Sequence, residues 1–542
     1  MSSRKILLPT IFLTCVATVA GVRAQQPESQ VSAQEKLQRK VLTVPKSYLD
    51  RMRDQGAVLE LSLKEAIRLA LLNNLEIAIE NYNEDLNREQ VVKTRGFYDP
   101  TIGFTVGWSS RTSPTTSILQ AGQNVNVNTS DTFTLNSSLR QNVLGGGALE
   151  VTFNNTRSET NSVFFTINPR FDSSFNVSFT QPLWRGFLKT NTERQIKVFN
   201  LEREISDTQF KQRVVEVVQQ VENQYWEAVF SVENFETQRR SMELAIIQHQ
   251  NNRKRVEIGV MAPIEITSSE AEVARRQQTL IQSEVQIINA QNGLKRLLAP
   301  DPNASIWKLA LAPTDRPQVR DVTLTLEQAI QKSVEHRPEL ERIRLQMEQN
   351  EVNRDFYKKE GKPTVNLRAN FGSVGAAGQL SDSSDPRLGS FGNAWGQVFG
   401  FDFRSWGIFA DVQIPLRNRS NAADLATVAI QDRQLQSTMK NQQQLVIVEV
   451  RNAFETIATR KQSLESARVA RQLSEEQLEG ENKRFEAGLS TNFAVLRFQR
   501  DLAESQSNEL RAEIDYQLAL IALEKAMYTI IGDNDIVLAR GR

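Results

Sequence analysis

The sequence predicts a mainly α-helical, internally duplicated fold, in which each half combines a long helical hairpin with a block of β-strands. The segment LSLKEAIRLALLNNLEI that begins at Leu61 is matched by LTLEQAIQKSVEHRPEL, which begins at Leu324. Later in each half, RVEIGVMAPIEI from Arg255 is matched by RFEAGLSTNFAV from Arg484. A repeat of this length is not a short-unit solenoid. We therefore expect two copies of one large supersecondary unit.

The N-terminus has the pattern of an export signal. Residues 1–24 combine a basic start, an apolar stretch and a small-residue cleavage site, as in a secretory signal peptide. The only cysteine, Cys15, lies in the apolar stretch, so the mature chain is expected to contain no disulfide. Lipidation of Cys15 is an alternative. The formal net charge of +1, without a long basic run, does not indicate nucleic-acid binding.

The rest of the chain divides by composition and by the repeat. The expected segments are a polar N-terminal arm (25–58), a first repeat (59–299), a linker (300–322), a second repeat (323–532) and a C-terminal tail (533–542). Each repeat is expected to begin with two helices, followed by the strands and then by the long hairpin.

Prolines mark the change from helix to strand. Proline disfavours helix in the residue before it, so Pro100 and Pro363 are expected to end the second helix of each half. Sequence of alternating polarity follows each proline, and a Pro-Leu pair at Pro182 or Pro415 ends the strand block. The first block is longer, and one extra hairpin near residues 132–157 accounts for the difference. The Gly-, Ser- and Asp-rich stretch from 372 to 403 is expected to be an exposed loop.

Long helical hairpins are expected at residues 190–299 and 420–532. Proline-free sequence runs to Gly259 in the first half and to Gly488 in the second, where glycine suits a left-handed helix end. Apolar residues spaced by three and four form a coiled-coil seam along the first helix of each hairpin. The seam residues are Val218, Val221, Tyr225, Ala228, Val232 and Phe235, and then Val450, Phe454, Ile457 and Leu464.

The number of strands limits how they can enter a membrane. Two strands in each half give four per chain, and the extra hairpin raises this number to six if it joins the same sheet. Closed bacterial barrels have at least eight strands, and strand edges do not stay open in lipid. If these strands are embedded in a membrane, several chains must therefore share one barrel, and three chains of four strands give a 12-stranded β-barrel. The helical hairpins are then expected to form an α-barrel.

The order and duplication of these motifs resemble the TolC-type outer-membrane efflux proteins. The resemblance covers about residues 58–532 and rests on the paired openings, the prolines, the strand ends TQPLW and QIPLR, and the two hairpin tips. It implies a homotrimeric channel in outer-membrane lipid that extends into the periplasm, with residues 300–322 in the equatorial region. It further implies docking to a periplasmic adaptor protein and an inner-membrane transporter. The cargo stays open between drugs, metals and secreted proteins.

In that family the hairpin tips form the periplasmic gate. The tip positions here are Arg255, Gly259, Glu265, Arg484, Gly488 and Arg497. Glu265 matches an acidic position of the family, whereas Ala494 and Arg497 stand where some members have aspartates. One hypothesis is that three Glu265 carboxylates give the closed mouth a preference for cations, and another is that Arg497 pairs with an acid and latches the closed state. Alternatively, Glu265 is a solvated surface residue and the glycines are turn residues only.

No residue pattern indicates an enzyme, a cofactor or a metal site. The two histidines, His249 and His336, lie on different predicted helices, and no nucleophile or phosphate-loop motif is present. The aromatic residues of the strands suit either a packed sheet or a girdle at a membrane interface: Trp108, Phe175, Phe179, Trp184, Trp406 and Phe409. The competing hypothesis is a secreted coiled-coil structural or adhesin-like protein, but a simple spacer does not need two blocks of aromatic strands.

Overall fold

The computed structural model describes residues 44–115, 127–162, 165–380 and 389–534. The predicted signal peptide with Cys15, most of the polar arm and most of the C-terminal tail lie outside these residues. Two compact units are present. Among the described residues, the tip unit comprises 44–51, 231–287 and 470–507, and the body unit comprises 52–230, 288–469 and 508–534.

The opening helices of the two halves are built alike. The first pair is α3 (Leu63–Asn73) and α4 (Leu75–Arg95), and the second pair is α8 (Leu326–His336) and α9 (Pro338–Glu360). Each pair begins with a capping box, in which Ser62 exchanges hydrogen bonds with Glu65, and Thr325 exchanges them with Gln328. The duplication seen in the sequence is therefore also present in how the helices begin.

Four long helices form the two hairpins. They are α6 (Asn191–Glu257) and α7 (Ile264–Leu298) in the first half, and α11 (Arg419–Glu486) and α12 (Asn492–Met527) in the second half. At 1.5 Å per residue, α6 and α11 are each roughly 100 Å long. The fold class is thus mainly α-helical with two long hairpins, as predicted. None of the helices described is long and apolar enough to cross a membrane.

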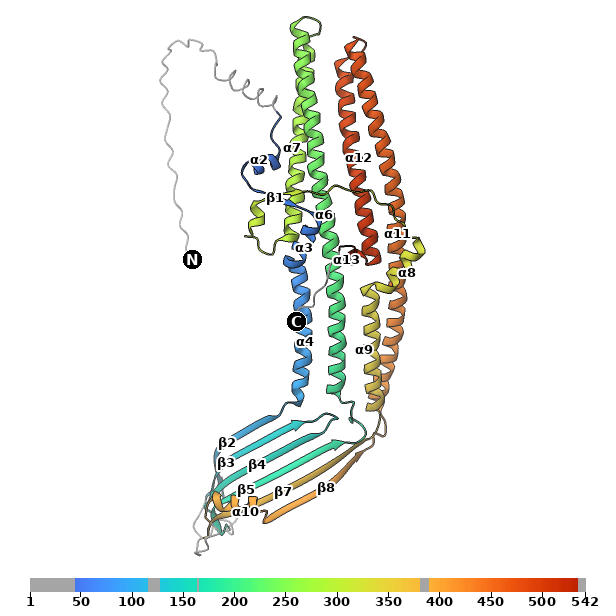
Figure 1. Ribbon diagram of the computed structural model, residues 1–542. Helices are drawn as coiled ribbons and strands as arrows, with labels where there is room; N and C mark the ends of the chain where they lie inside the picture. Colours follow the sequence, from blue (N-terminus) through green and yellow to red (C-terminus); the bar gives the residue numbers. More distant parts are fainter. Residues whose placement is uncertain (1–43, 116–126, 163–164, 381–388, 535–542) are drawn as a thin grey trace, which may run out of the picture. The chain divides into compact units, whose positions relative to one another are not determined.

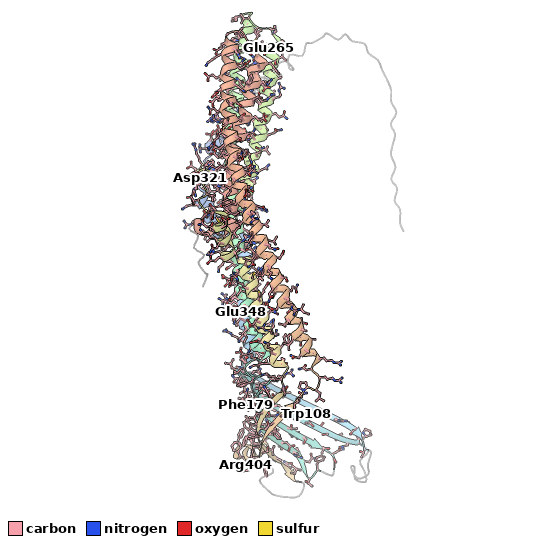
Figure 2. The ribbon with its side chains drawn as sticks, turned by 90° about the vertical axis from the view of Figure 1, so that its right-hand side faces the viewer. Trp108, Phe179, Glu265, Asp321, Glu348 and Arg404 are labelled. Atoms are coloured by element: carbon pink, nitrogen blue, oxygen red, sulfur yellow. The ribbon has the colours of Figure 1, made fainter. Side chains whose placement is uncertain are left out.

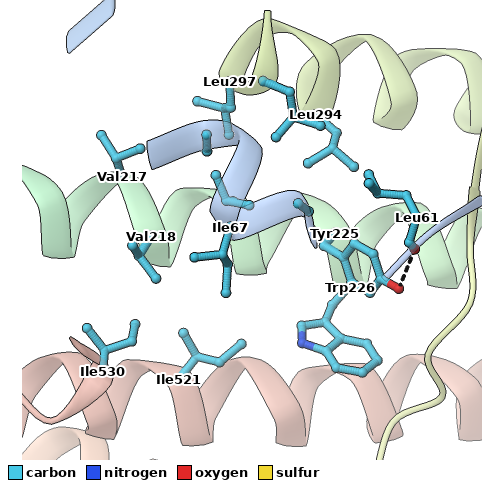
Figure 3. Packing of buried hydrophobic residues seen from close by; sticks show 14 of the residues in the cluster. Leu61, Ile67, Val217, Val218, Tyr225, Trp226, Leu294, Leu297, Ile521 and Ile530 are labelled. Carbon is cyan, nitrogen blue, oxygen red and sulfur yellow. Dashed lines mark hydrogen bonds between the residues drawn. The ribbon is translucent and has the colours of Figure 1, made fainter. Parts of the chain in front are cut away.

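The body unit contains a core for each half. In the first, Ala66 and Ile67 of α3 are buried against α6 and α7, and Ile521 of α12 also joins this core (Figure 3). In the second core, Ala329 of α8 is buried against α11 and α12. Ala66 and Ala329 are equivalent in the repeat and both are 0% exposed, because a small side chain lets the short helix approach the long one. The tip unit has a separate core around Phe235, Met242 and Leu280 in α6 and α7.

A small parallel sheet joins the N-terminal arm to the linker. Strand β1 (Val58–Leu61) pairs with β6 (Ala310–Pro313), which follows the 3-10 helix η3 (Ser305–Lys308). Neither strand was predicted from the sequence, because four residues are too few to show an alternating pattern. The helix α2 (Tyr48–Asp54) within the polar arm was not predicted either.

The main sheet of the body unit is antiparallel throughout, with the strand order β2-β3-β4-β5-β7-β8 (Figure 1). Its strands are β2 (Thr101–Pro114), β3 (Val127–Asn142), β4 (Ala148–Thr160), β5 (Ile167–Pro182), β7 (Thr364–Leu380) and β8 (Phe403–Gln413). The extra hairpin is β3–β4, and it lies between β2 and β5. Of the two strand counts that the sequence allows, four and six, the sheet has six.

Prolines stand at the ends of the strands. Strands β2 and β7 begin directly after Pro100 and Pro363, and a 3-10 helix, η1 (Gly96–Tyr98), separates α4 from Pro100. Pro182 is the last residue of β5, and Pro415 follows the end of β8 by two residues.

The expectation of a long exposed loop between 372 and 403 is wrong. Strand β7 continues to Leu380, and residues 391–400 form the helix α10 (Phe391–Gly400). Ser390 caps this helix by accepting a hydrogen bond from the Gly392 amide. The glycines favoured a loop, but the segment also has a helical pattern of aromatic residues. Phe391, Trp395 and Phe399 recur every four residues and share one side of a helix.

The side chain of Tyr225, which belongs to the first core of the body unit, is hydrogen-bonded to the small sheet of β1 and β6. Its hydroxyl lies 3.0 Å from the Leu61 carbonyl oxygen (Figure 3). It also lies 2.8 Å from Asp315 Oδ2 and accepts hydrogen bonds from the backbone amides of Thr314 and Asp315. Burial is the main reason why the pKa of Tyr225 rises to about 12; the backbone amides of Asp315 and Thr314 oppose the rise, and the Asp315 carboxylate supports it. The hydroxyl is therefore protonated at neutral pH and available as a donor.

We predict that Tyr225→Phe lowers the free energy of unfolding by about 1–3 kcal/mol, because buried backbone groups lose their partner. Tyr528→Phe is the matched control, since the buried Tyr528 hydroxyl has no hydrogen-bond partner among the described residues. That variant should be neutral or slightly stabilised. Chemical denaturation of the purified variants measures both values. Equal losses in the two variants would contradict the role given to the Tyr225 hydroxyl.

Candidate functional site: the helical tip and the two faces of the sheet

The two hairpin tips have the same backbone turn. Gly259 has φ +77° and Gly488 has φ +75°, the left-handed conformation that favours glycine. The Val260 amide donates to the Arg255 carbonyl at 2.9 Å, and the Leu489 amide donates to the Arg484 carbonyl at 2.8 Å. Both turns are Schellman motifs. The two tip glycines and the two arginines thus have the same backbone role in each half.

The side chains of those arginines differ in their contacts. The Arg255 guanidinium lies 4.4 Å from the centre of the Phe485 ring, so it reaches from the first hairpin to the second. Arg484 lies 3.8 Å from Glu481 on its own helix. Of these two arginines, only Arg255 connects the two hairpins through a contact among the described residues.

Glu265 takes part in a polar contact between the hairpins. Its carboxylate accepts a hydrogen bond of 3.0 Å from the Asn492 side chain at the start of α12. The buried Asn492 accepts in turn a hydrogen bond of 3.2 Å from Gln248 in α6. Glu265, labelled in Figure 2, is thus bound to the second hairpin of its own chain and is more than a solvated surface carboxylate.

The contacts of Arg497 with other described residues lie within its own helix. Its guanidinium lies 3.6 Å from Asp501, one turn along the same helix, and 5.5 Å from the centre of the neighbouring Phe498 ring. The side chain is more than half exposed. The predicted pairing with an acid is present, but an ion pair within one helix cannot by itself hold two hairpins together.

A residue that the sequence analysis did not single out, Arg276, connects three helices. Its guanidinium donates to the Ser241 carbonyl in α6 at 2.8 Å and to the Leu496 carbonyl in α12 at 3.1 Å, and it pairs with Glu272 in α7 at 3.1 Å. Burial lowers the pKa of Arg276, and the hydrogen bond to Glu272 opposes this effect. Among the many arginines of these polar helices, no local pattern marks Arg276 as buried.

A third polar contact lies farther along the hairpins. Ser507 Oγ in α12 lies 2.9 Å from Asn234 Oδ1 and accepts a hydrogen bond of 3.1 Å from Gln238, both in α6. The two hairpins of the tip unit are therefore joined by polar groups at successive levels. Contacts of this kind can be exchanged for water at a smaller cost than a packed apolar core.

The histidines have structural positions. His249 is buried, with Nδ1 2.9 Å from Ser269 Oγ, and burial lowers its pKa. His336 is exposed, and its Nδ1 lies 3.0 Å from the Lys332 carbonyl. Within the described part of the chain, no group of His, Cys, Asp and Glu side chains could hold a metal ion.

The register of the main sheet sorts its side chains onto two faces. Directly opposed residues of antiparallel strands share a face, and successive residues alternate between faces. The pairs Ile102–Leu139, Leu139–Val151 and Val151–Val177 therefore define one face across four strands. We call it the apolar face, and its large apolar side chains are Ile102, Phe104, Val106, Trp108, Phe133, Leu135, Leu139, Leu149, Val151, Phe153, Phe171, Phe175, Val177, Phe179, Val365, Leu367, Phe371, Trp406, Ile408 and Val412. The same face also carries the charged residues Asp131, Arg157, Glu159 and Arg404.

The opposite face, which we call the polar face, carries mainly hydroxyl, amide and charged groups. Arg368 and Asp411 form an ion pair on it, across β7 and β8. Its further polar members include Thr105, Ser109, Thr134, Asn136, Thr152, Asn154, Asn176, Ser178, Asn370 and Ser405. A sheet with one apolar and one polar face suits a boundary between lipid and water.

The aromatic residues singled out in the sequence divide between these surfaces. Trp108, Phe175, Phe179 and Trp406 lie on the apolar face, whereas Phe409 lies on the polar face. Trp184 follows β5 and is half exposed. Figure 2 labels Trp108 and Phe179 on the sheet.

Comparison with known proteins agrees with this architecture. The second half of the chain matches the outer membrane efflux protein family. The matched residues are 329–527, which cover α11, α12 and the sheet strands β7 and β8. The resemblance to outer-membrane efflux proteins that the sequence predicts is thereby confirmed. No curated protein sequence matches the chain.

Solved structures share the fold over nearly the whole chain. A membrane protein from Pseudomonas aeruginosa is 15% identical, with a TM-score of 0.61 over 86% of this chain and 93% of that one. The Campylobacter jejuni CmeC outer membrane channel is 13% identical, with a TM-score of 0.62 over 86% of this chain and 85% of that one. The open state of the Neisseria gonorrhoeae MtrE outer membrane channel is 14% identical, with a TM-score of 0.58 over 86% of this chain and 88% of that one. At these identities the likeness concerns the fold.

We predict that Asn492→Ala weakens the contact between the hairpins by roughly 1–2 kcal/mol, because Gln248 and Glu265 lose a partner. Amide exchange at the start of α12 should become about tenfold faster. Asn492→Asp should have a larger effect, since a second carboxylate would repel Glu265. Hydrogen exchange with mass spectrometry measures both.

Arg497→Ala is the control for the Asn492 variants, because its ion pair lies within one helix. Its exchange at the start of α12 should stay close to that of the parent protein. Equal acceleration in the Arg497 and Asn492 variants would contradict a specific contact at Asn492.

Acidification is predicted to loosen the tip unit. Burial lowers the pKa of His249, while Glu270 raises it and Arg253 lowers it further. The folded tip therefore binds fewer protons than the unfolded chain below the ordinary histidine pKa of about 6.5, and stability falls as the pH drops through this window. Hydrogen exchange in α6 and α7 near His249 should speed up at acidic pH. His249→Gln should remove this pH dependence, whereas replacement of the exposed His336 should preserve it.

Proposed function

We propose that the protein is a passive exit duct in the outer membrane, through which an inner-membrane transporter expels its cargo. The observation that carries this proposal is the main sheet, with its apolar face, its polar face and its two outermost strands. Exposed aromatic and aliphatic side chains such as Phe104 and Trp406 would be costly in water and favourable in lipid. The hydroxyl and amide groups of the polar face would line a water-filled interior.

The outermost strands require further copies of the chain. Strands β2 and β8 each pair on one side only within the described sheet. Open strand edges are not tolerated in hydrocarbon, so β2 of one copy is expected to pair with β8 of the next until the barrel closes. Three copies is the number that the resemblance to outer-membrane efflux proteins implies.

The strand count changes the expected barrel. Three chains of six strands make an 18-stranded barrel, in place of the 12 strands expected from four per chain. At equal strand tilt the diameter grows roughly in proportion to the strand number, so the barrel would be about 1.5 times wider. The hairpin β3–β4 is therefore the element that sets the width of the exit.

The tips are proposed to be the periplasmic entrance. When the protein docks to a periplasmic adaptor and an inner-membrane transporter, this entrance has to open. Opening would break the polar contacts that Glu265, Arg276 and Ser507 make between the two hairpins. Three Glu265 carboxylates near the closed mouth would also favour cations over anions. Cargo selection is assigned to the partners, so the duct suits drugs, metals or a secreted protein equally.

We predict that the purified chain is a heat-modifiable trimer that forms ion-conducting pores in planar bilayers. Deletion of residues 127–160 removes β3 and β4 and leaves β2 and β5 antiparallel, so a four-stranded unit can still form. Electron microscopy of trimers in nanodiscs should show an 18-stranded barrel for the full chain and a narrower, 12-stranded barrel for the deletion variant. In the same recordings, Glu265→Gln should reduce the preference for cations.

The competing hypothesis predicts a different outcome. A secreted coiled-coil spacer or adhesin-like protein would be recovered without lipid and would conduct no ions. Either result for the full chain would overturn the proposed channel. An outer-membrane pore with unaltered barrel width in the deletion variant would overturn only the role given to β3–β4.

A further inference from the structure

The helix α10 lies on the apolar face of the main sheet. The centre of the Phe391 ring is 4.8 Å from that of Phe171, and the Phe399 ring lies 5.6 Å from that of Phe153. Trp395 also contacts Phe153, at 6.0 Å between ring centres. Both strand residues belong to the apolar face, so the register places α10 on the side opposite the polar groups. Figure 1 shows α10 beside the strands β5 and β7.

Under α10 lies a buried polar patch on the apolar face. Asn155, Ser173 and Ser373 share the apolar face and are buried, at 2%, 3% and 0% exposure. The Trp395 ring nitrogen donates to Asn155 Oδ1 at 2.6 Å, and Ser173 Oγ donates to the same oxygen at 2.8 Å. Such groups are costly against hydrocarbon unless they are hydrogen-bonded and covered. Helix α10 provides a donor for Asn155 and covers the patch, in which the Ser373 hydroxyl has no hydrogen-bond partner among the described residues.

The helix also closes part of a strand edge. Strand β8 begins at Phe403, which pairs with Val374, so within the described sheet the following residues of β7 have no strand beyond them on this side. The Ala376 amide donates instead to the Gln397 side chain of α10 at 3.0 Å. Gln397 thereby supplies an acceptor at a position where lipid could not.

Close packing makes α10 a fitted part of the sheet. A Cβ atom on Gly375 would lie 2.1 Å from the Ala394 carbonyl oxygen, so the helix approaches as closely as glycine permits. Ala394 and Val398 of α10 face the sheet side of the contact and are fully buried. On the outer side, Phe399 is 58% exposed and Trp395 37% exposed. The ten residues of α10 include no charged side chain.

We propose that α10 is a membrane-embedded helix on the outside of the barrel, where Trp395 and Phe399 bind the acyl chains of the outer membrane. The helix shields the polar patch and extends the apolar face outward. This inference rests on the proposed function, because it requires the apolar face to meet lipid. A helix that plugged the pore would have to contact the polar face instead.

The test uses single cysteines labelled with bimane in the full-length trimer. The trimer is reconstituted in phosphatidylcholine vesicles with brominated acyl chains, and aqueous iodide is used as the second quencher. Phe399→Cys reports on α10, Ser405→Cys on the polar face, and Phe104→Cys on the apolar face of β2. Gly396→Cys is a second probe of α10, since a Cβ there meets no atom within 4 Å.

The labels at Phe399 and Gly396 should be quenched severalfold more by brominated lipid than the label at Ser405, and less by iodide. If Phe104 is quenched by lipid but both α10 labels respond only to iodide, α10 is not in the bilayer and the inference is overturned. If Phe104 also responds only to iodide, the sheet is not in lipid and the proposed function itself fails. The two failures are thus distinguishable.

Discussion

One register runs through the six strands of the main sheet, and the surface chemistry of the sheet follows from it. Because side chains alternate between faces, an apolar residue in one strand fixes the face of its partners in every neighbouring strand. A shift of a single residue in any strand would bring polar side chains into the apolar face. The prolines that directly precede β2 and β7 therefore do more than end a helix. They also set the residue at which the alternation of side chains between the two faces starts.

The duplication is closest where the backbone is under the strictest demands. Helix starts, tip turns and the alanine contact of the short helices are the same in both halves, because each requires a particular cap, a positive φ or a small side chain. The halves differ where only side chains or strand number are at stake. The Arg255 side chain contacts Phe485 in the second hairpin, whereas the Arg484 side chain contacts Glu481 on its own helix. In the main sheet, the first half contributes two more strands than the second half.

Most of the fold could be predicted because its signals are local and repeated. The tip glycines, the prolines and the long seams each act through a few neighbouring residues, so single motifs were enough. The short strands β1 and β6 were missed because each depends on a distant partner for its pairing. Helix α10 was missed because its glycines favoured a loop, whereas packing on Gly375 and the aromatic face decides its structure.

The candidate site was less predictable for the same reason. Glu265 was found through the resemblance, but its partner Asn492 could not be, because the contact joins residues far apart in the chain. Arg276 looks like any other arginine of a polar helix until three helices surround it. Burial in a tertiary contact leaves no trace in the spacing of residues.

The most direct test of the account is the accessibility of nitroxide labels placed one at a time at residues 102–107 of β2, in the reconstituted protein. Oxygen, which dissolves in lipid, and a water-soluble nickel chelate compete as relaxation agents. The account predicts a period of two, with Ile102, Phe104 and Val106 accessible to oxygen and Gly103, Thr105 and Gly107 accessible to nickel. Equal access of the nickel chelate to both sets would contradict a sheet that separates lipid from a water-filled pore.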